Sequence, residues 1–130
     1  MTIDLWMLVA SALLSLAIPY ISLVGLARAP GGMAWGFGNR DVPIAVPAWV
    51  ERTRRAHANM VENLAPFAVL VLVAHLTGKA NGTTALGAEL FFLGRVAHLL
   101  VYAAGIPVVR TLVFGVAVAG EILILTQLFG

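Results

Sequence analysis

Cysteine is absent from this 130-residue sequence. The absence excludes a disulfide framework, a thiolate metal site and a thiol nucleophile provided by the protein itself. Any sulfur chemistry would therefore need a thiol brought by a cosubstrate. Histidine is also scarce, and the three histidines lack the close spacing and neighbouring carboxylates of a metal site. The sequence thus predicts no bound metal.

Charged residues are equally sparse, at 11% of the chain against about 25% in soluble domains. Hydrophobic residues make up 61%, and the mean hydropathy is +0.97. A soluble domain of this length could not bury so much apolar surface. No cluster of basic residues with interleaved aromatics indicates nucleic-acid binding. We therefore expect a single integral membrane domain over residues 1–130.

Four long apolar segments predict an all-α fold, a bundle of four transmembrane helices. The first runs from Leu5 to Ala27 without a charge, which exceeds the ~20 residues needed to span a bilayer. Asp4 precedes it and no basic residue does, so we interpret it as a retained helix and not a signal peptide. The other helices are predicted at about residues 48–76, 85–104 and 111–128. Residues between the first two, rich in glycine and proline, are expected to form a loop.

Basic residues indicate the orientation of the bundle. Six of the eight lysines and arginines fall on one predicted side of the membrane. These six are Arg28, Arg40, Arg52, Arg54, Arg55 and Arg110. The positive-inside rule then places the long loop in the cytoplasm and both termini outside. In a bacterium this would be the inner membrane, with periplasmic termini.

The second and third predicted helices each carry a polar face. Arg55, Asn59 and Glu62 follow i, i+4, i+7 spacing on the second helix. Ionisable groups inside a membrane cost about 2.5–3.5 kcal/mol each and usually face a bundle interior or a polar cavity. The third helix repeats the pattern with a second set of three. This set is Arg95, His98 and Tyr102.

These two faces are predicted to meet. When two antiparallel helices are joined by a short turn, a residue of one helix lies at the same depth as the residue of the other whose number gives a constant sum with its own. The expected layers are Arg55 with Tyr102, Asn59 with His98, and Glu62 with Arg95. The innermost layer could be a structural ion pair that fixes register, or part of the site. Glu121, deep in the fourth helix, could also pair with Arg95. Such a site would suit a small zwitterion or a proton path.

The second and third predicted helices carry the motifs R-A-x-x-N-x-x-E, over residues 55–62, and Gly94-Arg-Val-Ala-His-Leu-Leu-Val-Tyr102. Both resemble motifs of the MAPEG family (membrane-associated proteins in eicosanoid and glutathione metabolism). The resemblance implies a homotrimer of four-helix subunits with glutathione, the cosubstrate, held between neighbours. It implies a glutathione transferase or peroxidase whose second substrate is a lipophilic electrophile or lipid hydroperoxide from the membrane lipids.

The resemblance also assigns roles residue by residue. Arg110 matches an arginine that stabilises the thiolate, and Tyr102 and Thr111 are the other catalytic candidates. The glutathione contacts implied are Arg28, Arg55, Asn59, Glu62, His98, Tyr102 and Arg110.

The alternative is a non-catalytic membrane protein. It could be a binding or assembly subunit, or a small proton-conducting protein. A proton path would use Glu62, Arg95, His98 and Glu121.

Overall fold

The computed structural model describes all 130 residues, and every regular element is a helix. The helices are α1 (Ile3–Arg28), α2 (Gly32–Phe37), α3 (Ala48–Leu76), α4 (Gly82–Ala104) and α5 (Pro107–Leu128). Four of them, all except α2, are long and apolar enough to cross a membrane. The four predicted helices are thus confirmed, although α4 begins at Gly82 and α5 at Pro107, each a few residues earlier than expected.

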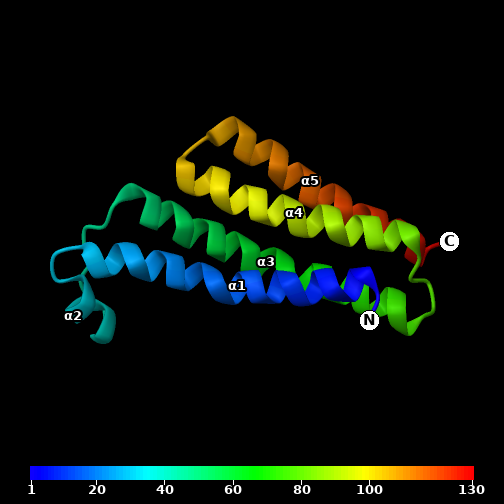
Figure 1. The fold of residues 1–130 in the computed structure, drawn as a ribbon, viewed down its shortest axis with the longest axis horizontal. Helices are drawn as coiled ribbons and strands as arrows, with labels where there is room; N and C mark the ends of the chain where they lie inside the picture. The colour runs from blue at the N-terminus through cyan, green and yellow to red at the C-terminus, as the bar shows by residue number, and fades with distance from the viewer.

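The long helices pair as α1 with α3 and α4 with α5, and α4 also packs against α1 and α3. Figure 1 shows both chain termini and the α3–α4 connection at one end of the bundle. The α4–α5 turn, α2 and the start of α3 lie at the other end (Figure 1). The arginines of the long loop and Arg110 therefore gather at one end of the molecule, as the sequence predicted.

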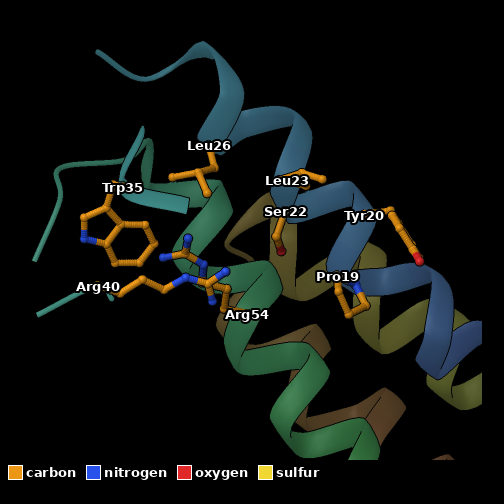
Figure 2. Close-up of a pocket in the computed structure, with 8 residues that line it drawn as sticks. All are labelled: Pro19, Tyr20, Ser22, Leu23, Leu26, Trp35, Arg40 and Arg54. Atoms are coloured by element: carbon orange, nitrogen blue, oxygen red, sulfur yellow. The ribbon is translucent and has the colours of Figure 1, made fainter. Parts of the chain in front are cut away.

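The short helix α2 lies in the segment expected to be a loop without regular structure. Gly31 precedes it with φ +71°, a left-handed conformation that glycine adopts without steric cost. The helix carries Trp35, whose indole Nε1 donates to the carbonyl oxygen of Val42. Figure 2 shows this indole beside the end of the Arg54 side chain, which comes from α3. The loop is therefore folded against the bundle by an aromatic residue at the end of the membrane-spanning region.

Small residues let α4 and α5 approach closely. A Cβ added at Gly87 would lie 2.6 Å from the carbonyl oxygen of Gly120, and one added at Gly94 would lie 3.0 Å from Ala117. Ala117 and Gly120 therefore serve packing between α4 and α5 of the same chain.

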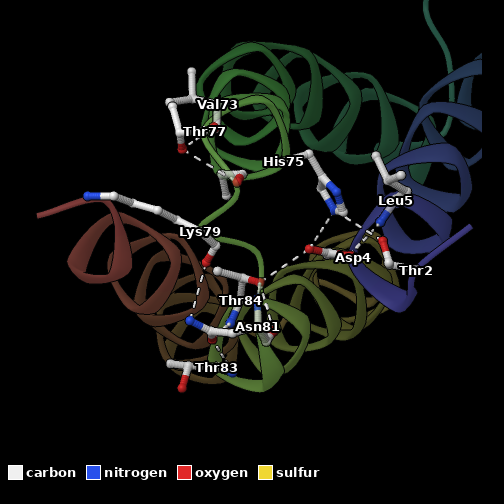
Figure 3. A network of polar contacts seen from close by, with 11 residues as sticks. Thr2, Asp4, Leu5, Val73, His75, Thr77, Lys79, Asn81, Thr83 and Thr84 are labelled. Atoms are coloured by element: carbon white, nitrogen blue, oxygen red, sulfur yellow. Dashed lines mark hydrogen bonds and ion pairs between the residues drawn. The ribbon is translucent and has the colours of Figure 1, made fainter. Parts of the chain in front are cut away.

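A polar network closes the end of the bundle that holds the termini (Figure 3). Asp4, at the start of α1, is buried, and its Oδ2 lies 2.9 Å from His75 Nε2 and accepts from Thr84 Oγ1 at 3.2 Å. Asn81 caps α4 through its Oδ1, which accepts from the backbone nitrogen of Thr84 at 3.2 Å. The network ties α1, α3 and α4 together. His75 is therefore a structural contact between α3 and α1.

Candidate functional site

The polar residues of α3 do not share one environment. Asn59 is half-buried against the bundle, whereas Arg55 and Glu62 are exposed on the outer surface of the protomer. Glu62 stands beside exposed apolar side chains, such as Val61 and Val69, which are 49% and 59% exposed. A carboxylate in an apolar, membrane-facing surface is costly unless another group covers it. The outer face of α3 therefore holds a carboxylate that no group of this chain covers.

The polar residues of α4 face inward. Arg95 and His98 are 2% and 5% exposed, and Tyr102 is half-buried nearer the end of the helix. Arg95 Nη1 donates to Asn59 Oδ1 at 2.7 Å. The predicted ion pair between Arg95 and Glu62 does not form within this chain, because Glu62 points outward. The guanidinium of Arg95 instead contacts the side-chain amide of Asn59, about one turn away from Glu62 on α3.

The depth matching of α3 and α4 is nevertheless close to the prediction. Phe67 and Phe91 stack with ring centroids 3.8 Å apart, and Arg52 Nε donates to the carbonyl oxygen of Ala103 at 2.9 Å. Both contacts join residues at nearly the depth that the antiparallel arrangement predicts. Asn59 with His98 and Arg55 with Tyr102 are not joined by hydrogen bonds.

Arg95 is held between aromatic rings. Its guanidinium carbon lies 5.0 Å from the ring centroid of Phe91 and 5.1 Å from that of Phe114, and such contacts favour a buried cation. Its Nε and Nη2 have no hydrogen-bond partner, nor does Oε1 of the half-buried Glu121 on α5. No ion pair joins Arg95 to Glu121. The centre of the bundle thus contains a guanidinium and a carboxyl group with unused hydrogen-bonding capacity.

A second polar site lies at the α4–α5 turn. It is a cavity of about 160 Å³, and its polar side chains are Arg52, Tyr102 and Arg110. The guanidinium of Arg110 stacks over the Tyr102 ring, 4.6 Å from its centroid. Gly105 shapes the turn with φ +81°, and a Cβ built there would lie 3.1 Å from the Arg52 guanidinium carbon. Two fixed cations and a phenol therefore converge where an anion could bind.

Of the predicted residues, the structure unites Arg110 and Tyr102 in this cavity and places His98 edge-on to Tyr102, with centroids 5.3 Å apart. Thr111 is exposed, and its hydroxyl donates to the carbonyl oxygen of Pro107 at 3.3 Å. Arg28 is exposed at the end of α1 and does not line the cavity.

Arg52 is the site residue that we missed. Its signal in the sequence was its position one turn before Arg55, although we assigned Arg52 only to membrane orientation.

Comparisons with known proteins agree on one family. The sequence profile described as "MAPEG family" matches residues 5–130. Microsomal glutathione S-transferase 1 from Bos taurus and that from Homo sapiens are each 40% identical to this chain over 58 residues. The Rattus norvegicus protein is 36% identical over the same length. These alignments cover 45% of this chain and 37% of each relative, so the chain matches well under half of the length of these relatives.

Proposed function

Because the chain belongs to the MAPEG family, we propose that this integral membrane protein is a glutathione-dependent transferase or peroxidase. Similarity to microsomal glutathione S-transferase 1 over part of the chain supports glutathione as the cosubstrate. The acceptor would be a lipophilic electrophile or a lipid hydroperoxide that enters from the bilayer. The arginine-rich end would face the cytoplasm under the positive-inside rule.

The observation that carries the proposal is the pairing of Arg110 with Tyr102 beside Arg52. Glutathione reacts as its thiolate, whereas an unperturbed thiol has a pKa of about 8.5 and is mostly protonated at neutral pH. A fixed guanidinium favours the anion, and unlike histidine it stays charged at any working pH. Arg110 also lies in the first turn of α5, where the helix dipole favours negative charge.

Neither of the two proposed reactions needs a side chain of the protein as a reactant. In conjugation, the thiol releases its proton to solvent, the thiolate sulfur bonds to the electrophilic carbon, and the leaving group departs with its electron pair. In peroxide reduction, two glutathione thiols supply two electrons and two protons. The oxygen–oxygen bond then breaks, and one disulfide, one alcohol and one water form.

A single protomer provides only part of such a site. The cavity of about 160 Å³ is smaller than the ~300–1,000 Å³ of typical ligand pockets. Arg55 and Glu62 lie on the exposed face of α3, where they would bind the charged ends of the tripeptide if a neighbouring subunit covered them. We therefore propose a homotrimer with glutathione at the subunit interface and Arg28 available to the adjoining site. Native mass spectrometry should show a trimer, and a stable dimer or monomer alone would contradict the proposal.

Replacement of Arg110 tests the proposed catalytic role. In Arg110→Leu we expect turnover with an electrophile such as 1-chloro-2,4-dinitrobenzene to be largely abolished. The ultraviolet band of the bound thiolate should disappear while isothermal titration still detects glutathione binding. The matched control is Arg40→Leu, which removes an arginine at the same end of the bundle but outside the cavity. If Arg110→Leu retains both its rate and its thiolate band, Arg110 serves only as a membrane anchor.

One observation favours a second candidate, a proton-conducting protein. Arg95 Nε and Nη2 and Glu121 Oε1 are buried without partners, and His98 is buried on the same helix as Arg95. Such groups line proton paths in membrane proteins. Proton flux in liposomes, measured with a pH-sensitive dye and compared with the Glu121→Gln variant, distinguishes this candidate. Glutathione-dependent turnover without flux would exclude conduction.

A further inference from the structure

A separate groove of about 590 Å³ lies at the arginine-rich end, between α1, α2 and α3 (Figure 2). It is larger than the cavity at the α4–α5 turn and shares no lining residue with it. One part of its wall is polar and comes from Trp35, Arg40 and Arg54. The other part is α1, which contributes apolar side chains and Ser22. The groove is therefore amphipathic.

Two cations meet in the polar part. The guanidinium carbons of Arg40 and Arg54 lie 5.5 Å and 5.6 Å from the centroid of the Trp35 ring, and Figure 2 shows both groups ending beside the indole. Arg54 has one acidic partner, because its Nη1 lies 2.8 Å from Glu51 Oε1. Arg40 donates only to the carbonyl oxygen of Gly36, at 2.9 Å and 3.2 Å. The groove keeps a net positive charge that an anion would neutralise.

Ser22 gives independent evidence of a ligand. Its side chain lines the groove and is 6% exposed, yet its hydroxyl has no hydrogen-bond partner. Serine hydroxyls inside helices commonly bond to a carbonyl of the preceding turn, which this one does not. A buried hydroxyl without a partner is unfavourable, so a ligand atom that reached it would be stabilised.

The apolar part continues away from the arginines along α1. Leu13, Leu16, Tyr20 and Leu23 are 61%, 67%, 69% and 45% exposed. Their spacing places them on one side of the helix over roughly 15 Å, at 1.5 Å per residue. Pro19 lines the groove between these residues and the polar part. A ligand with a charged head and a long apolar tail would match both halves.

The position of the groove identifies the source of such a ligand. Trp35 and the two arginines lie at the end of membrane-spanning helices, the level at which tryptophan and arginine meet lipid headgroups. We propose that the groove binds an anionic phospholipid of the surrounding bilayer. Its phosphate lies between Arg40 and Arg54, an oxygen of its headgroup or ester region accepts from Ser22, and one acyl chain follows α1. This assignment does not depend on glutathione chemistry.

Titration of the intact, detergent-solubilised protein with two lipids tests the assignment. Dioleoylphosphatidylglycerol and dioleoylphosphatidylcholine have the same chains and both contain phosphate, but only the first has net negative charge. Native mass spectrometry of lipid adducts should show that phosphatidylglycerol binds at least fivefold more tightly than phosphatidylcholine. The expected ratio follows because one basic residue near an anionic lipid surface raises the affinity about fivefold. Equal affinities would overturn the proposal.

Single substitutions locate the site. Arg40→Gln should weaken phosphatidylglycerol binding fivefold or more, whereas Arg28→Gln, which removes a cation at the same end outside the groove, should weaken it less than twofold. Glu51→Gln should strengthen binding, because it frees Arg54 from its carboxylate. This gain cannot come from damage to the fold. Equal losses in Arg40→Gln and Arg28→Gln would indicate only general surface attraction, and unchanged or weaker binding in Glu51→Gln would also contradict the assignment.

Discussion

Replacement of Gly120 by alanine should test the packing of α4 against α5. An added Cβ at Gly120 would collide with the carbonyl oxygen of Gly87, and it would lie 2.9 Å from the backbone nitrogen of Phe91 and 3.2 Å from Leu90 Cβ. These neighbours are mostly backbone atoms of α4, so no flexible side chain can turn away. The two helices would have to separate along their shared interface.

Overpacking of this kind typically costs about 1–3 kcal/mol. For a chain of this length we expect the melting temperature of Gly120→Ala to fall by roughly 5–15 °C. Thermal unfolding in detergent, followed by circular dichroism at 222 nm, provides the measurement. The matched control is Gly115→Ala in the same helix, where the new methyl group meets nothing within 4 Å.

Gly115→Ala should leave the melting temperature unchanged or raise it slightly, because alanine favours helix by about 0.5–1 kcal/mol over glycine. If both variants melt at the wild-type temperature, α4 and α5 do not approach as closely as the structure shows. If only the Gly115 variant loses stability, α5 packs against α4 through the face that contains Gly115 and not through the face that contains Gly120.

Two further perturbations address the polar contacts. Asp4→Asn removes the charge that faces His75 and should destabilise the protein by about 1–3 kcal/mol in chemical unfolding. Asp41→Asn, at an exposed residue without an ion pair, should change stability by less than about 0.5 kcal/mol, and equal effects would contradict the structural role of Asp4. A double-mutant cycle of Asn59→Leu with Arg95→Met should give a coupling energy of about 0.5–3 kcal/mol. Additive losses would show that this contact does not contribute to stability.

The sequence predicted the depth of residues in the bundle better than their direction. Depth depends on the rise along two antiparallel helices and on the position of the turn between them, both of which can be read from spacing. Direction depends on rotation about the helix axis, at about 100° per residue. Asn59 is thereby turned about 40° from Arg55 and about 60° from Glu62. A modest rotation of α3 therefore buries the asparagine and leaves Arg55 and Glu62 outside.

Other parts of the structure had weak signals in the sequence. The helix α2 lies in a stretch rich in glycine, a residue with low helix propensity, and it is six residues long. Asp4 lies at the start of α1 and His75 at the end of α3, and no local sequence pattern indicates that the two residues are in contact. In contrast, Gly105 and Pro107 marked the α4–α5 turn. Glycine favours the left-handed conformation that ends α4, and proline favours the first position of a helix, here α5.

The network around Asp4 also has a consequence for biosynthesis. Asp4 and Thr84 are 80 residues apart in the chain, so a ribosome working at about 5–20 residues per second needs roughly 4–16 s to supply this partner. During most of that interval the only group in the protein that binds this carboxylate is the backbone nitrogen of Leu5, which donates to Asp4 Oδ1 at 3.2 Å. Water and lipid headgroups must supply its other partners until His75 on α3 and then Thr84 on α4 arrive. The closing of this network is thus a late event that requires α1, α3 and the first turn of α4.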